Sequence, residues 1–484
     1  MILSRNRSWI FLFFVLLFGA TAPLVLFFAF GYRYSFERGI FIFSGSITVK
    51  TIPETVNIEV DGEPIPKKRL GLLNNSIHIT GLMPGEHTLH ISAPGYLPWE
   101  KRLIIESGVS REFWNVILPH TDYPKDTFAA TDTTERAYPH PSEANVFALI
   151  KHVENEISIT LLNTQSRQAK QVFSLPNSTL DIHQEENLEW SWFENGRFIL
   201  VPITTQGTAQ HFVIDTTTGT FFTLEEQTGL TNISLARWET QQSNQVIFLA
   251  GTTLYRLTTT PGSIPEPIND RTLTYTLSNG NLYLVTTDGM IWQEKSGRLI
   301  ALKQGRTPPT NQSALLRNIY DSSHFALLEK DNNKRLFLFY PRPDTGALTF
   351  KEGGSMIDGM QFSNDGKKLL FFSNNEIGVI FTHNWEVQPR RLAGDIVQVA
   401  RFSEPIANVS WAENYEHIVF SVGPTVKFIE LDGRDQRFIG NLQNLPAPPT
   451  QIISSFSENR LYFIVPNYDI TSIVFPEPQG FFGQ

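Results

Sequence analysis

Two hydrophobic patterns divide the chain. Trp9 to Phe30 form one apolar run without a charged side chain, whereas most of the remaining sequence alternates short apolar runs with polar turns. An α-helix of that length extends roughly 33 Å, enough to cross the hydrocarbon core of a bilayer. The pattern therefore predicts a transmembrane helix over residues 9–31, preceded by a short tail at residues 1–8.

A second interpretation of the apolar run is a cleaved signal peptide. Arg5 and Arg7 precede it, and the Ala-Thr-Ala segment at 20–22 resembles a cleavage site. Against this, Pro23 would stand directly after the cut, which is an unfavourable position, and the apolar run continues to Phe30. These two features favour an uncleaved anchor.

The charges flanking the apolar run bear on its orientation. Arg5 and Arg7 on one side nearly balance Arg33 and Arg38 on the other under the positive-inside rule. A short basic tail commonly stays in the cytoplasm while a long acidic remainder is exported. We therefore predict a single-pass cell-membrane protein with a cytoplasmic N-terminus and its bulk outside the cytoplasm.

Residues 45–119 follow a juxtamembrane linker at 32–44 and alternate apolar and polar positions with period two. Gly, Pro and Asp-Gly turns separate the alternating segments. Short strands with about ten-residue spacing are typical of a small antiparallel sandwich. Strands are expected at residues 46–52, 56–60, 77–80, 87–91 and 103–105.

The second half of this module carries a family resemblance. The segment 84–96, PGEHTLHISAPGY, resembles a PEGA domain. In the first half, Pro53 and Glu54 fit the four-residue motif of that family, whereas Thr55 and Val56 depart from it. The resemblance implies a β-sandwich of envelope and surface proteins that serves as a spacer or interaction module and carries no catalytic residues.

One pattern recurs through residues 121–484. A large, mostly aromatic anchor precedes a polar turn, which often ends in Asn-Gly or Asp-Gly, and then a β-rich apolar run. All-β units with a period near 45 residues are typical of propeller blades, each a four-stranded sheet. The anchors are Tyr138, Trp192, Trp238, Leu277, Tyr320, Phe362, Trp411 and Phe456.

This array resembles WD-repeat and Tol-type propellers, and residues 362–372 (FSNDGKKLLFF) match them best. Eight anchors favour eight blades. Seven remain an alternative, because the Tyr138 copy is weak. Residues 127–131 could supply the outer strand that closes the ring. The anchor tryptophans are expected to fill the space between blades, with carbohydrate stacking as the alternative role.

The composition and the missing motifs exclude several kinds of catalytic and binding site. The chain has no cysteine, which excludes thiol catalysis, disulfides and thiolate metal sites. Its net charge of −9 argues against a nucleic-acid-binding protein, which needs clustered positive charge. The nucleophile-elbow, zinc-protease, P-loop and EF-hand motifs are all missing from the sequence.

A few polar residues could suggest a site, and each has a plainer interpretation. His87 and His90 are three apart on an expected strand and point to opposite faces, which disfavours a shared metal. The basic run at 67–69 is expected in a solvated loop. Asp321, Asp365 and Asp432 are expected to satisfy backbone donors in blade turns.

The sequence therefore predicts an all-β, membrane-anchored cell-envelope protein, in which a propeller is presented for binding or scaffolding. No catalytic, cofactor-binding or metal site is expected, and the chain is not expected to be an enzyme. Expected partners are the bilayer, through residues 9–31, and an envelope protein or polysaccharide. A hydrolase or lyase that acts on envelope polysaccharide through the propeller channel is the alternative, and sensing is a third possibility.

Overall fold

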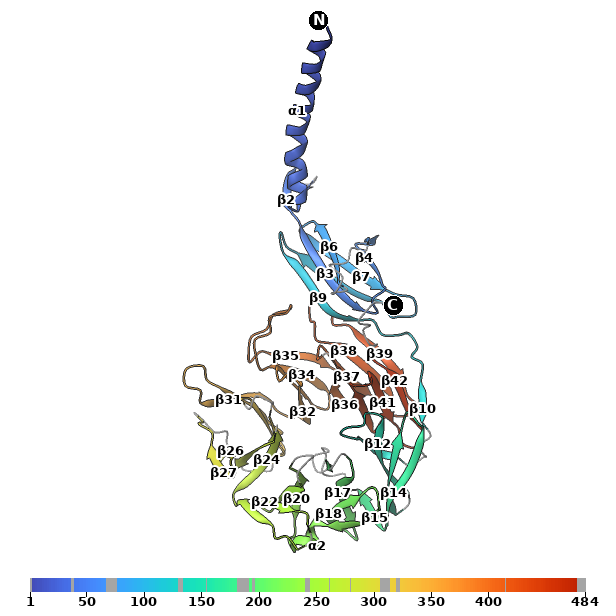
Figure 1. The fold of residues 1–484 in the computed structure, drawn as a ribbon, viewed down its shortest axis with the longest axis vertical. Coiled ribbons are helices and arrows are strands. Elements are labelled where there is room, and N and C mark those ends of the chain that lie inside the picture. The colour runs from blue at the N-terminus through green and yellow to red at the C-terminus, as the bar shows by residue number, and fades with distance from the viewer. Residues whose placement is uncertain are drawn as a thin grey trace.

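The computed structural model describes residues 2–35, 39–66, 76–128, 134–153, 155–180, 191–193, 196–239, 244–260, 262–278, 280–304, 314–318, 323–413 and 415–476. Three parts follow one another along the long axis of the molecule: a helix, a small β-sandwich and a ring of β-sheets, seen through its opening in Figure 1. Apart from two helices, the described elements are strands. The expected all-β fold is confirmed.

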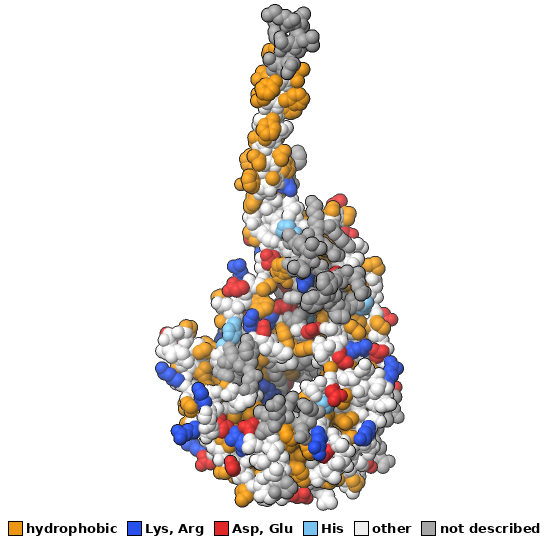
Figure 2. Space-filling model, viewed as in Figure 1, with side chains coloured by type: hydrophobic (Ala, Val, Ile, Leu, Met, Phe, Trp, Pro, Cys, Tyr) orange, Lys and Arg blue, Asp and Glu red, His pale blue; other side chains and the backbone are white. Residues whose placement is uncertain are grey.

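Helix α1 (Ile2–Ala29) contains the apolar run. Its segment Trp9–Ala29 has a mean hydropathy of 2.6 over 21 residues and is not buried by the rest of the chain. The exposed apolar side chains of this segment stand out in Figure 2. The helix is therefore long and apolar enough to cross a membrane.

Part of the segment between helix and sandwich forms a hairpin rather than a plain linker. Strand β1 (Tyr32–Ser35) pairs with β2 (Ile40–Phe43) in antiparallel register. Tyr32 stands opposite Phe43, and Tyr34 opposite Phe41. Aromatic and β-branched residues favour such extended pairing.

The sandwich consists of a three-stranded and a four-stranded sheet, ordered β6-β3-β9 and β5-β4-β7-β8. One correction to the antiparallel expectation is needed, because β3 and β9 pair in parallel. The chain crosses from the other sheet after β8, so β9 runs beside β3 in the same direction. The strands are β3 (Gly45–Ile52), β4 (Asn57–Val60), β5 (Glu63–Pro64), β6 (Ile77–Leu82), β7 (Gly85–Ser92), β8 (Trp99–Ile105) and β9 (Ser110–Ile117).

Within the described residues the ring comprises eight sheets, and each sheet is antiparallel. The first sheet contains β11 (Thr134–Pro139), β12 (Val146–Val153), β13 (Glu156–Asn163) and β14 (Gln168–Pro176). The second contains β15 (Ser178–Leu180), β16 (Ser191–Phe193), β17 (Phe198–Thr205), β18 (Thr208–Asp215) and β19 (Phe221–Thr223), followed by helix α2 (Leu224–Thr228). The third contains β20 (Ile233–Trp238), β21 (Gln245–Ala250), β22 (Thr253–Thr258) and β23 (Glu266–Asn269). The fourth contains β24 (Thr272–Ser278), β25 (Asn281–Thr286), β26 (Ile291–Lys295) and β27 (Arg298–Ala301).

The remaining sheets continue the same order around the ring. The fifth contains β28 (Ala314–Asn318), β29 (Phe325–Glu329), β30 (Leu336–Pro341) and β31 (Leu348–Gly354). The sixth contains β32 (Gly359–Phe362), β33 (Lys368–Phe372), β34 (Glu376–Phe381) and β35 (Ile396–Arg401). The seventh contains β36 (Ile406–Trp411), β37 (His417–Val422), β38 (Thr425–Glu430) and β39 (Ile439–Asn444). The eighth contains β40 (Gln451–Ser455), β41 (Arg460–Ile464), β42 (Ile470–Val474) and β10 (Asp126–Phe128).

Strand β10 closes the ring. It precedes the first sheet in the sequence but pairs with β42, the last strand, with Phe128 opposite Ile470. In Figure 1, β24 and β32 lie nearer the opening than β27 and β35, so the first strand of a sheet is the inner one. Seven four-stranded sheets and one five-stranded sheet, closed into a ring, form a β-propeller. The closing strand expected near residues 127–131 is confirmed at residues 126–128, whereas residues 129–131 lie outside the described residues.

Each boundary between neighbouring sheets is filled by one apolar cluster. Trp192, Trp238 and Trp411 are buried in three of these clusters, which confirms their expected place between blades. Because a sheet can bury its second face only against its neighbour, the repeated units require the ring. The anchor Tyr320 lies outside the described residues.

Candidate functional site

The sandwich and the propeller meet at a buried ion pair. Lys101 on β8 and Glu430 at the end of β38 have 0% and 6% of their side chains exposed and contact each other through Nζ and Oε1. Trp99 Nε1 donates to Glu430 Oε2 at 3.0 Å, and the Phe438 amide donates to Oε1 at 2.7 Å. Burial raises the pKa of Glu430, and Lys101 and Trp99 oppose that shift.

Arg434 makes the second set of contacts between the two modules. Its guanidinium lies 3.8 Å from the centre of the Phe113 ring of β9 and donates to the carbonyl of Glu112 at 2.6 Å. On the propeller side it pairs with Asp432 at 2.6 Å and donates to Gln388 at 3.1 Å. A planar cation that stacks and donates in several directions holds the partners in one geometry.

Gln388 completes the contact between the modules. Its Nε2 donates to the carbonyl of Ser110 at 2.9 Å, and its Oε1 accepts from the Glu112 amide at 3.2 Å. The turns that follow β34 and β38 thus bind the backbone of β9. The sandwich is consequently docked on the sixth and seventh sheets.

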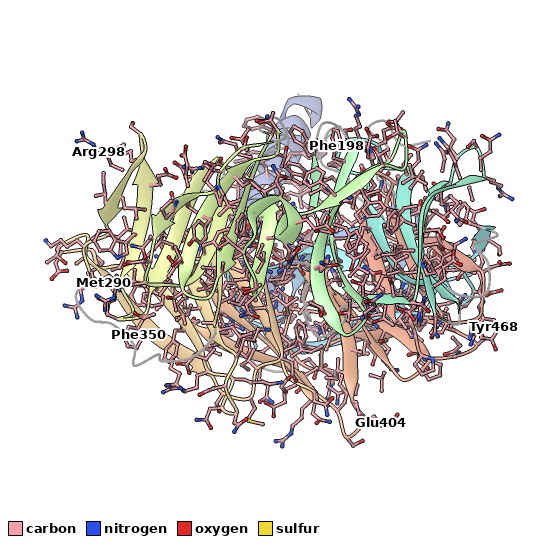
Figure 3. All side chains as sticks on the ribbon, turned by 90° about the horizontal axis from the view of Figure 1, so that it is seen from below. Phe198, Met290, Arg298, Phe350, Glu404 and Tyr468 are labelled. Carbon is pink, nitrogen blue, oxygen red and sulfur yellow. The ribbon has the colours of Figure 1, made fainter. Side chains whose placement is uncertain are left out.

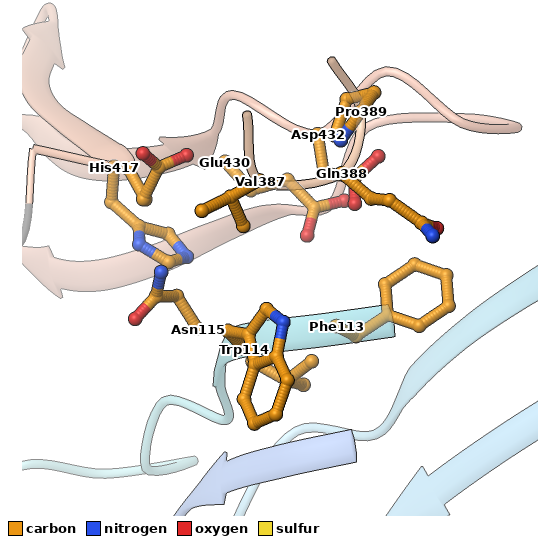
Figure 4. Close-up of a pocket in the computed structure, with 11 residues that line it drawn as sticks. Phe113, Trp114, Asn115, Val387, Gln388, Pro389, His417, Glu430 and Asp432 are labelled. Atoms are coloured by element: carbon orange, nitrogen blue, oxygen red, sulfur yellow. The ribbon is translucent and has the colours of Figure 1, made fainter. Parts of the chain in front are cut away.

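A small cavity lies between β9 and these turns (Figure 4), with Asn115 and Trp114 of the sandwich facing His417, Glu430 and Asp432 of the propeller. Its volume is about 30 Å³, which corresponds to about one water molecule. Burial lowers the pKa of His417 to about 3, with Lys368 adding to the shift. The cavity therefore brings an imidazole and several carboxylates together at the boundary between the two modules.

Beside His417 lies a second ion pair, between the buried Lys368 and the partly buried Glu416, which also lines the cavity. Lys368 Nζ donates to the carbonyl of Tyr415 at 2.8 Å and lies 3.8 Å from the centre of the Trp385 ring. Burial lowers the pKa of Lys368 and raises that of Glu416. Both groups are used to join the sixth and seventh sheets.

Two larger, open grooves flank the first sheet. One lies between the first and second sheets and has a volume of about 480 Å³; the other lies between the eighth and first sheets and has about 510 Å³. Polar side chains dominate both. The first groove is lined by His140, Glu143, Asn163, Gln168, Lys170 and Arg197, and the second by Asp126, Asn145, Gln165, Arg167, Arg460 and Tyr462.

The polar residues selected from the sequence do not converge on one site. His87 Nδ1 contacts Asp61 at 2.6 Å, whereas His90 contacts Glu100 at 3.2 Å, so the two histidines serve different carboxylates. Asp365 accepts from the Lys367 amide at 3.1 Å. Across the described residues, no cluster of three or more His, Asp or Glu could hold a metal ion.

Asp432 accepts a backbone hydrogen bond in its turn, as expected, and also forms an ion pair. It accepts from the Arg434 amide at 2.9 Å, as expected, and it also pairs with the Arg434 guanidinium at the module junction. Asp321 and the basic run at 67–69 lie outside the described residues.

Sequence reasoning missed the junction, although one signal was present. Trp99, Lys101, Leu103 and Ile105 occupy alternate positions of β8, all buried. A lysine in phase with inward-facing apolar residues marks a buried charge that needs a partner. The partner could not be identified, because Glu430 lies more than 300 residues further along the chain.

No protein-family profile matches the sequence, and no curated protein matches it. Solved propellers resemble its fold. The Cps50 (Swd1) propeller domain of Myceliophteria thermophila is 10% identical and covers 72% of this chain and 99% of its own, with a TM-score of 0.43. The C-terminal WD40 domain of Sif2 is 8% identical over 73% and 99%, with a TM-score of 0.47. The Dos1 propeller is 12% identical over 74% and 97%, with a TM-score of 0.48.

At such low identity the likeness concerns the fold alone. The propeller assignment rests on the eight sheets and on the closure by β10 and β42. The ligands and partners of these proteins are not transferred to this chain.

Proposed function

We propose that this chain is a membrane-anchored binding or scaffold protein of the cell envelope, with the propeller as its recognition module. The observation that carries the proposal is the sandwich–propeller junction, where Lys101, Glu430 and Arg434 are engaged across the two modules. Because the sandwich is docked on the propeller, it holds the ring in one orientation relative to the anchor. Such preorganisation reduces the entropic cost of binding.

In this proposal α1 spans the bilayer with its N-terminus in the cytoplasm, and the sandwich is a PEGA-like spacer. The apolar length of α1 and the resemblance at residues 84–96 support these roles. Protease treatment of intact cells is expected to cleave the region beyond Gly45. Protection of that region, or a mature protein that begins after residue 22, would contradict the anchored, exported arrangement.

The two polar grooves beside the first sheet are the proposed recognition surface. They open on the side of the ring that carries the turns between first and second strands and between third and fourth strands, where Glu143 and Ser166 lie in the first sheet. Their amide, hydroxyl and charged groups suit hydrogen bonding to a protein partner or to a glycan. Glu404, between β35 and β36, lies on the opposite side of the ring from Phe198 (Figure 3).

Site-specific photo-crosslinking in intact cells tests this surface. A photoreactive residue at Gln168 or Gln165, both exposed in the grooves, is expected to give a discrete adduct that the same residue at Glu404 does not give. A protein adduct identifies the partner, whereas an adduct lost on glycan digestion identifies a polysaccharide. Equal labelling at all three positions would contradict groove recognition.

We further infer that the chain is not an enzyme. The buried acid and base groups around His417 serve ion pairs or enclose a cavity of about 30 Å³, which supports a structural role for them. Incubation of the purified chain with envelope polysaccharide is expected to leave the polymer length unchanged. Shortened or unsaturated products would instead support the hydrolase or lyase alternative.

A further inference from the structure

The hairpin β1–β2 carries an apolar surface that the rest of the chain leaves uncovered. Ile40, Phe41 and Phe43 are 55%, 37% and 41% exposed, and Tyr34 is 41% exposed. Eight paired residues with this much exposed aromatic surface are unusual on a solvated protein face. We therefore expect another apolar phase or surface to cover these side chains.

The hairpin packs beside the end of α1. The Phe41 ring is stacked on Phe27 with ring centroids 5.6 Å apart, and Tyr32 meets Phe27 edge-on at 5.3 Å. Phe27 stands two residues before the last residue of α1, about 3 Å of helix rise inside the apolar segment. Phe41 therefore lies at the depth of the final apolar turn of the anchor.

Polar contacts hold the hairpin at this depth. Arg33 donates to the carbonyl of Phe28 at 3.1 Å and lies over the Phe28 ring at 5.1 Å. The same carbonyl also accepts from the Gly31 amide at 3.1 Å, and a cation beside the last carbonyls of a helix is favourable. Ser44 donates through both its amide and its hydroxyl to the carbonyl of Gly31, at 2.9 and 2.6 Å.

The hairpin is also joined to the sandwich. Ser107 Oγ donates to the carbonyl of Phe43 at 2.8 Å. The Phe43 ring lies so close to Gly108 that a Cβ there would stand 2.7 Å from it. Gly108 also has a φ of +72°, which a residue with a side chain adopts only with strain. The hairpin thus connects helix and sandwich through direct packing.

From this geometry we infer that β1–β2 lies in the boundary between headgroups and acyl chains of the bilayer, with Ile40, Phe41 and Phe43 in contact with lipid. The inference rests on the proposed spanning role of α1. The exposed hairpin surface is continuous with that of α1 through Phe27 and Phe41, so the same lipid covers both. Aromatic residues favour this interfacial zone, where the polar edges of a hairpin can still be hydrated. The hairpin then sets the height of the sandwich above the membrane.

The absence of cysteine allows a direct test in the full chain. Single cysteines at Phe41, at Phe18 in the middle of α1 and at Ile300 on the propeller, all exposed positions, are labelled with an environment-sensitive fluorophore. The protein is reconstituted into phospholipid vesicles that carry a nitroxide either near the headgroup or near the chain end. Quenching by each lipid and by aqueous iodide is then measured.

The Phe41 label is expected to be quenched more by the shallow than by the deep nitroxide, the Phe18 label more by the deep one, and the Ile300 label only by iodide. If the Phe41 label responds to iodide alone, or to neither quencher because protein covers it, the hairpin inference is overturned while the Phe18 result still supports the anchor. If the Phe18 label is not quenched by lipid, the spanning role and the hairpin inference both fail.

Discussion

Lys101 and Glu430 belong to different modules, yet they form one ion pair from which solvent is almost excluded. Trp99 and the Phe438 amide occupy further acceptor sites of the same carboxylate. Removing charges from water is unfavourable unless each remaining donor and acceptor is satisfied. This network satisfies them only while the sandwich stays docked, so the ion pair couples the folding of the two modules.

Replacing Lys101 with Met should therefore destabilise the protein strongly. The change leaves the Glu430 carboxylate buried without its cation, which costs about 3–5 kcal/mol in comparable sites. Guanidinium unfolding of the full chain in detergent, followed by tryptophan fluorescence, measures the loss. The double variant Lys101→Met, Glu430→Gln should recover part of it, because the unpaired charge is gone.

The neighbouring surface pair supplies the control for that experiment. Arg102 is 60% exposed and approaches Asp435 at 3.4 Å, and exposed pairs contribute at most about 1 kcal/mol. Arg102→Ala should therefore have a small effect. Equal losses for Lys101→Met and Arg102→Ala would show that the buried pair does not couple the modules.

His417 should make the protein sensitive to acid. Its folded pKa of about 3 lies below the ordinary value of 6.5. As the pH falls below 6.5, the histidine of the unfolded chain takes up a proton, whereas the buried histidine of the folded chain stays neutral. The contribution of His417 to stability is therefore present above pH 6.5 and is lost as the pH falls toward 3. Between pH 7.5 and 5 this loss amounts to about 2 kcal/mol. Unfolding free energies of the native chain and of His417→Gln at both pH values measure it.

The variant should lose about 2 kcal/mol less than the native chain over that interval. His90→Gln is the matched control, because His90 is partly exposed beside Glu100. An unchanged pH dependence in His417→Gln would rule out His417 as the source of the acid sensitivity.

Closure of the ring depends on Phe128. Its side chain on β10 is 5% exposed and packs with Tyr462, Phe147 and other residues of the cluster between the eighth and first sheets. Phe128→Ala should destabilise the propeller by about 3–5 kcal/mol, because it leaves a cavity where the chain ends meet. Ile300→Ala, at a position 50% exposed, should stay within about 0.5 kcal/mol, and thermal unfolding compares the two.

Arg434 should restrict motion between sandwich and propeller. Spin labels at Ile104→Cys and Ile300→Cys, both exposed, report the distance between the modules by pulsed electron resonance. A single narrow distribution is expected in the native background and a broader one with Arg434→Ala, which loses the contacts to Phe113, Glu112 and Gln388. A distribution that is already broad in the native background would remove the observation on which the proposed function rests.

The sequence alone determined the architecture because its signals are local. An apolar run of sufficient length predicts a helix that can span a bilayer, and period-two alternation with recurring anchors predicts sheets about 45 residues apart. Among the described anchors, Trp238, Phe362 and Trp411 are the last residues of β20, β32 and β36. Even the closing strand near residue 127 could be placed, because a ring needs a partner for its last strand.

Only the tertiary structure decided what joins these parts. Lys101 and Glu430 meet across more than 300 residues, and Arg434 reaches Phe113 over a similar separation. The hairpin was also invisible to the pattern, since strands of four residues gain their stability from packing on α1 and the sandwich. Sequence periodicity reports which face of an element is buried, whereas docking depends on the position of each face in space.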